Sequence, residues 1–132
     1  MNFPKCDVKS NGANFPQQNR KCSRFTGTFK QMREISSQRS STVFGVIEIE
    51  VSGESGVFQD YLNFNPQKPE KSMGFLVAHC KAAAKAAGLE ISDEEEHDME
   101  WVQKTYESLM GKSVRFEQTM NANGQTSINY LA

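Results

Sequence analysis

The two-residue period that β-strands impose on side chains is clearest in two neighbouring segments. Residues 42–51 (TVFGVIEIEV) and residues 57–64 (VFQDYLNF) each alternate their side chains between two faces. The Ser- and Gly-rich stretch between them predicts a hairpin loop. A slip of one residue would turn every side chain to the opposite face, so the pattern also predicts orientation: Ile47 and Leu62 face the core, whereas Tyr61 faces away.

Three further segments alternate in the same way. They are residues 21–35, residues 112–120 and residues 125–131. In the first of them Phe25 and Phe29 share one parity, and the Gly27 between them predicts a bulge or a sharp bend. The sequence therefore predicts five short strands.

The chain between the third and fourth strands has a helical period. Residues 72–87 (SMGFLVAHCKAAAKAA) place apolar side chains along one side, with Ser72 as the expected N-cap and Gly88 after the last turn. A second helix is expected to begin at Ser92, whose capping box with Glu95 opens an acidic first turn. The expected buried stripes are Phe75, Leu76, Cys80, Ala83, Ala84 and Ala87 in the first helix, and Met99, Val102, Tyr106, Leu109 and Met110 in the second.

The order of three strands, two helices and two strands predicts a mainly β chain with a helical insertion, of the α+β class. It is the connectivity of a five-stranded OB-fold barrel with two helices between strands 3 and 4. A small α+β sandwich has the same order and remains an alternative, because periodicity does not report whether a sheet closes. We expect an OB-fold domain over residues 21–132, preceded by a flexible N-terminal arm, residues 1–20, which Phe3 and Phe15 would anchor.

The net charge of −1 over 132 residues conceals an asymmetry. Of the 16 acidic residues, seven lie in residues 90–100, the acidic segment, and the rest of the chain carries 15 basic and 9 acidic residues, a net charge of +6. Residues 1–40 alone carry 8 basic and 2 acidic residues. A basic body of this kind indicates an anionic partner. Two arrangements stay open: the acidic segment lies away from the basic strands, or it folds over them and occupies the binding groove.

Several classes of protein are disfavoured. No apolar run reaches the roughly 20 residues of a membrane span, and no segment near Met1 resembles a signal peptide. Three widely spaced cysteines indicate a reducing, cytoplasmic setting. We expect no enzyme, no cofactor and no metal site, because the chain has neither a catalytic or nucleotide-binding motif nor a CxxC pair.

Three stretches carry a family resemblance: YLNF at residues 61–64, AAAKAAGLE at residues 82–90 and LMGKSVRFE at residues 109–117. Through them the chain, from about Arg24 to Leu131, resembles the phage-encoded OB-fold single-stranded-DNA-binding proteins, a family long carried as a phage domain of unknown function. The resemblance implies coating of single-stranded DNA during phage DNA replication or recombination in the host cytoplasm. Phage or host replication and recombination proteins would be further partners.

Binding of a single strand needs aromatic rings for the bases and cations along the backbone path. Phe44 and Tyr61 have a parity opposite to the core-facing residues of their strands and are the expected stacking platforms. The expected basic residues are Arg20, Lys21, Arg24, Lys30, Arg33, Arg39, Lys112 and Arg115. The plainer interpretation is a ring in the core, or a solvated surface charge, at each of these positions.

The alternative function is a phage-encoded protein-interaction module or inhibitor that docks on a host enzyme. The acidic segment beside a basic body would then be the docking surface. Salt-sensitive, sequence-tolerant binding would instead favour the nucleic acid. Exposed strand edges also leave a homodimer open.

Overall fold

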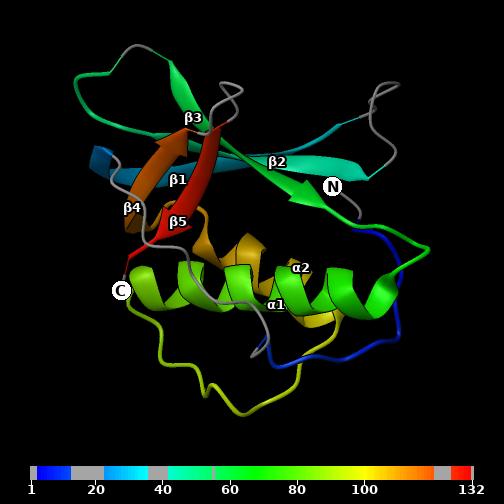
Figure 1. The fold of residues 1–132 in the computed structure, drawn as a ribbon. Coiled ribbons are helices and arrows are strands. Elements are labelled where there is room, and N and C mark those ends of the chain that lie inside the picture. Colours follow the sequence, from blue (N-terminus) through cyan, green and yellow to red (C-terminus); the bar gives the residue numbers. More distant parts are fainter. Residues whose placement is uncertain (1–2, 13–22, 36–41, 55, 121–125, 132) are drawn as a thin grey trace.

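The computed structural model describes residues 3–12, 23–35, 42–54, 56–120 and 126–131. Five strands form one antiparallel sheet, and two helices cover one of its faces (Figure 1). The strands are β1 (Ser23–Glu34), β2 (Val43–Glu50), β3 (Val57–Asn63), β4 (Ser113–Met120) and β5 (Thr126–Tyr130), and the helices are α1 (Pro69–Ala86) and α2 (Met99–Leu109). The predicted α+β class and the two helices between the third and fourth strands are confirmed.

The strands are ordered β3-β2-β1-β4-β5 in the sheet. β1 pairs with β4 through its first half and with β2 through its second half. Gly27 lies where this exchange of partners occurs, and a Cβ atom there would be 2.8 Å from the carbonyl oxygen of Glu50. The glycine therefore allows the close backbone approach that the change of partner requires.

The sheet is not closed into a barrel. β3 and β5 are the two edges of the sheet, and no ladder joins them among the described strands. The sheet nevertheless curls until side chains of the two edges meet. The hydroxyl group of Tyr130 on β5 lies 2.5 Å from the carboxylate of Asp60 on β3. We call the opening between the two edges the seam.

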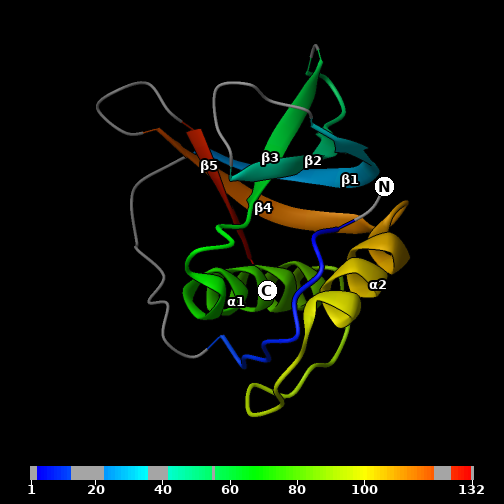
Figure 2. The ribbon, with the colours of Figure 1, turned by 90° about the vertical axis from the view of Figure 1, so that its right-hand side faces the viewer.

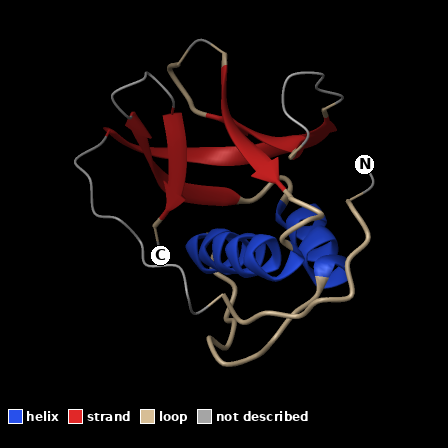
Figure 3. Cartoon of the chain, turned by 45° about the vertical axis from the view of Figure 1, so that its right-hand side comes forward, coloured by secondary structure: helices blue, strands red, loops and turns tan. Residues whose placement is uncertain are grey.

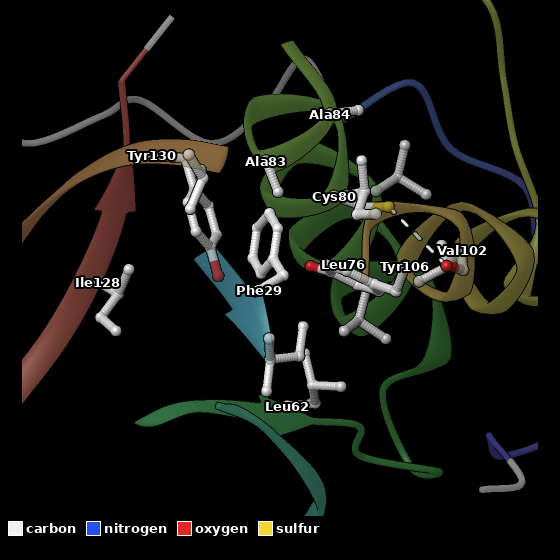
Figure 4. Packing of buried hydrophobic residues seen from close by; sticks show 14 of the residues in the cluster. Phe29, Leu62, Leu76, Cys80, Ala83, Ala84, Val102, Tyr106, Ile128 and Tyr130 are labelled. Atoms are coloured by element: carbon white, nitrogen blue, oxygen red, sulfur yellow. Dashed lines mark hydrogen bonds between the residues drawn. The ribbon is translucent and has the colours of Figure 1, made fainter. Parts of the chain in front are cut away.

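The core lies between the helices and the concave face of the curled sheet (Figure 3). Figure 4 shows Phe29 of β1 beside Tyr130 of β5, with ring centroids 5.6 Å apart, next to Cys80 and Ala83 of α1. The predicted stripe of α2 is buried, except that Met110 is only partly so. Phe75 of α1 was expected in the core, but its side chain is 44% exposed.

Neither helix begins where its capping signal predicts: α1 begins earlier and α2 begins later. α1 begins at Pro69, which suits the first turn because it lacks an N–H group. Ser72 therefore lies inside the helix, and its hydroxyl oxygen accepts the N–H of Asn65 at 2.9 Å. α2 begins at Met99, not at Ser92, because Asp98 caps it by accepting the N–H of Trp101 at 3.0 Å.

Residues 3–12 lie against the helices and form an N-terminal strap (Figure 2). Phe3 is buried, as its expected anchoring role requires, and Ser10 forms an antiparallel bridge with His97. Lys81 holds the end of the strap, since its ammonium group donates to the Asn11 carbonyl at 3.0 Å. Residues 13–20, the rest of the expected arm, lie outside the described residues.

Candidate nucleic-acid interface

The sheet face opposite the helices, the helix-free face, carries Tyr61. Its side chain is 46% exposed, as predicted, and its hydroxyl donates to Gln59 Oε1 at 2.9 Å. In the strand register Tyr61 is paired with Val46 of β2, and Val46 is paired with Arg33 of β1. Paired residues point to the same side of a sheet, so Tyr61 and Arg33 flank Val46 on this face.

Arg33 is held by a carboxylate from the neighbouring strand. Its Nε donates to Glu48 Oε1 at 2.7 Å, and Gln31 Nε2 donates to the same oxygen at 2.6 Å. The Gln31 hydrogen bond, with the Arg33 guanidinium, keeps the pKa of Glu48 below its usual value despite the opposing effect of burial. Glu48 is buried while Arg33 is half exposed, so this pair presents its cationic member to solvent.

A second basic group lies where β1 pairs with β4. Arg24 Nε is 3.6 Å from Glu117 Oε2, and again the arginine is exposed and the carboxylate buried. Arg115 is paired with Thr26 in the register and is therefore a diagonal neighbour of Arg24, at about 7–8 Å in a regular sheet. Arg115 is exposed and makes no ion pair with any described residue.

The other expected binding residues lie in bulges, just before a strand, or outside the described residues. Lys30 is the extra residue of a β-bulge in β1, and Lys112 precedes β4; both are exposed. Phe44 is the extra residue of a bulge in β2, which turns it from the expected outward position to a contact with Phe3, at 5.1 Å between ring centroids. Arg20, Lys21 and Arg39 lie outside the described residues.

The described arginines thus fall into two groups. Arg33 accompanies Tyr61 on the part of the face that β2 and β3 build, whereas Arg24 and Arg115 belong to the part that β4 builds. The division follows from β1, whose two halves pair with different strands.

A cleft lies at the seam and joins Tyr61 to β4 and β5. This seam cleft has a volume of about 270 Å³, and its described lining is Glu54, Gly56, Val57, Phe58, Gln59, Tyr61, Gln118 and Thr126. The ring of Phe58 belongs to an aromatic cluster, with centroids 4.6 Å from Phe25 and 5.4 Å from Phe116. The alternation in β3 predicted that Phe58 faces the core; that it also borders a cleft could not be predicted, because the cleft exists only where the sheet stays open.

Sequence reasoning also missed a buried polar cluster beneath the seam. Asp60 Oδ2 accepts the Tyr130 hydroxyl at 2.5 Å and lies 2.7 Å from His79 Nε2 on α1. Burial lowers the pKa of His79, but the adjacent Asp60 carboxylate outweighs it and leaves that pKa raised. Burial also raises the pKa of Tyr130 well above its usual value, so this phenol stays protonated as a donor. A signal existed: Asp60 is the polar residue on the parity of Phe58 and Leu62.

The acidic segment does not cover the helix-free face. It runs from the end of α1 into α2, on the side of the helices away from the sheet in all three ribbon views (Figures 1–3). Lys81 anchors it by donating to the Glu95 carbonyl at 2.9 Å, and Lys85 forms an ion pair with Asp93. The arrangement in which this segment occupies a groove on the sheet is therefore wrong.

Other chemistry is limited in the described ranges. They contain no group of three or more His, Cys, Asp or Glu side chains placed to hold a metal ion. No described helix is long and apolar enough to cross a membrane.

Compared with known protein families and with curated proteins, the sequence matches no family model and no curated protein.

Proposed function

We propose that the chain binds single-stranded DNA with little sequence preference, on the β2–β3 part of the helix-free face and in the adjoining seam cleft, during phage replication or recombination. The observation that carries the proposal is the exposed ring of Tyr61 at the border of a cleft that Phe58 also lines. Two aromatic rings beside an opening suit unstacked bases, which bind rings regardless of sequence.

The topology supports the same function. An OB-fold is a partly open five-stranded barrel whose strand 2–3 face binds oligonucleotides. The order β3-β2-β1-β4-β5, with helices between β3 and β4, and the unpaired seam agree with an OB-type sheet that stops short of closure. Tyr61 and Arg33 would then lie on the face that such folds use.

Charge distribution also favours this face. The ion pairs of Arg33 and Arg24 expose their guanidinium groups and bury their carboxylates. Arg115 adds a cation with no described ion-pair partner. Because the acidic segment lies on the far side of the helices, its carboxylates do not stand between this face and a phosphate backbone.

Salt titration of oligo-dT binding tests the proposal. The logarithm of the association constant, measured by fluorescence anisotropy, should fall linearly with the logarithm of salt concentration, and the affinity should exceed that for duplex of equal length. Arg33→Gln, on the β2–β3 part of the face, should reduce the salt slope by about one. Lys104→Gln, which removes an exposed cation from α2, is the control and should leave the slope unchanged. Equal binding of duplex, or no binding at low salt, would refute the proposal.

A protein-interaction module that docks on a host enzyme is the second candidate. It is favoured by the acidic segment, which lies on the side of the helices away from the sheet and in which Glu94, Glu95 and Glu96 are exposed. Recovery of one host protein that survives nuclease treatment, and that is lost when these three residues are changed to Gln, would support this candidate. Binding to DNA alone would argue against it.

A further inference from the structure

We propose that the seam cleft is a nucleobase pocket with a preference for guanine, and that Glu54 is the residue that reads the base. This inference rests on the proposed binding of single-stranded DNA and concerns one base position within it. Modest base preferences of this kind are compatible with binding that is otherwise sequence-tolerant.

The dimensions of the cleft suit one flat ring system. Its volume of about 270 Å³ lies just below the range of roughly 300–1,000 Å³ that takes drug-sized ligands. Phe58 and Tyr61 supply aromatic surface from β3, and Gln118 and Thr126 supply polar groups from β4 and β5. A base that enters the seam can therefore meet a ring and hydrogen-bonding groups together.

Glu54 is held at the cleft by the hairpin between β2 and β3. Its backbone N–H donates to the Val51 carbonyl at 3.2 Å, in a turn that contains Gly53 with a φ of +88°. Its exposed side chain lines the cleft and forms no ion pair with a described Lys or Arg residue. Glu54 thus brings to the cleft a carboxylate that has no ion-pair partner among the described residues.

Gln59 offers the complementary donor. Its Oε1 accepts the Tyr61 hydroxyl, so the opposite end of the amide, the Nε2 group, is the end available to donate. The cleft therefore combines a carboxylate that only accepts with an amide that donates.

Guanine matches this pair of groups best. Its Watson–Crick edge has two adjacent donors, N1–H and N2–H, which a carboxylate accepts together, and one acceptor, O6, for the Gln59 amide. Adenine and cytosine place a ring-nitrogen acceptor beside their amino group, and thymine flanks its single donor with two carbonyls. Each of these three bases would bring a lone pair against the Glu54 carboxylate.

The test compares oligo-dT strands that carry one central dG, dA or dC with unsubstituted oligo-dT, at one fixed salt concentration. The wild-type protein should bind the dG strand about tenfold more tightly than the other three. Glu54→Gln should abolish this ratio, whereas Glu70→Gln, an equal change of charge on α1, should keep it. Circular dichroism establishes that both variants are folded.

The outcomes separate this inference from the function on which it rests. Equal binding of all four strands by the wild type, or a dG preference that persists in Glu54→Gln, overturns the guanine pocket and leaves single-strand binding standing. Absence of binding to every strand overturns both. Saturable binding of free GMP without any preference among the four strands also overturns the assignment, because the pocket would then serve a free nucleotide.

Discussion

The hydroxyl group of Tyr130 donates to Asp60 Oδ2 at 2.5 Å, although the two residues are 70 positions apart in the chain. They lie on β5 and β3, the edge strands that a closed barrel would join by a backbone ladder. His79 of α1 lies 2.7 Å from the same carboxylate oxygen. One buried acceptor thus ties together both edges of the seam and the helix beneath them.

Removal of the Tyr130 hydroxyl should destabilise the fold. Tyr130→Phe keeps the ring but deletes a hydrogen bond to a buried carboxylate, so we expect the free energy of unfolding in urea to fall by about 1.5–3 kcal/mol. Tyr61→Phe deletes an exposed hydroxyl from β3 and should change it by no more than about 0.5 kcal/mol. Equal effects would show that the Asp60 contact contributes nothing beyond a surface hydrogen bond.

The contribution of His79 to the free energy of unfolding should depend on pH. Because its pKa is raised in the folded protein, the stability from its charged form is fully present below the unfolded value of about 6.5 and is lost as pH rises through the higher folded value. The loss of unfolding free energy caused by His79→Gln should therefore shrink as pH increases. Urea titrations across this range measure it.

His97 provides a control of opposite sign. Burial lowers its pKa, so the folded state resists protonation and the wild type loses stability as pH falls below about 6.5. His97→Gln should remove that loss. If both variants changed the pH profile in the same direction, the assigned environments of the two histidines would be wrong.

The ring of Tyr61 should contribute to single-strand affinity. Tyr61→Ala should weaken oligo-dT binding by roughly tenfold, the order of one base–ring stack. Phe75→Ala removes a similarly exposed ring, 44% exposed, from α1 on the other side of the sheet and should leave the affinity unchanged. A larger loss of oligo-dT affinity in Phe75→Ala than in Tyr61→Ala would indicate that the strand binds on the helices.

The strap should be sensitive to a single methyl group. Gly12 has a φ of +75°, and a Cβ atom there would lie 2.6 Å from Ala78 Cα. Gly12→Ala should cost about 1–2 kcal/mol for the left-handed backbone and a further ~1–3 kcal/mol for crowding, measured as reduced protection of the Ser10 and His97 amides from hydrogen exchange. Gly53→Ala meets only the backbone cost, since no atom of the described residues lies within 4 Å of its Cβ position. Unchanged protection in Gly12→Ala would mean that the strap does not pack as described.

Alternation along single segments was enough to predict the strands and most of their orientations, including the outward position of Tyr61. Alternation gave the wrong orientation for Phe44. The bulge between Val43 and Gly45 depends on the pairing of β2 with β3, and it inverts the alternation of side chains along β2 at that point. Sequence periodicity within one strand carries no information about an extra residue that its partner lacks.

The helix starts and the seam show a second limit. Ser92 and Asp98 both fit an N-cap, and the choice of Asp98 accompanies the pairing of His97 with Ser10, a contact between distant segments. The seam cleft likewise depends on how far the sheet curls. A single-stranded-DNA site could be proposed from Tyr61 and the arginines, but Phe58, Gln118 and Glu54 become neighbours only through the tertiary fold.

The seam also bears on the order in which the chain folds. Contacts across it link residues 70 positions apart, so they must pay a large loop-closure entropy before they contribute stability. The β2–β3 hairpin, by contrast, closes over a few residues. We therefore expect Tyr130→Phe to accelerate unfolding and to leave the folding rate nearly unchanged, which would make the docking of β5 against β3 a late step.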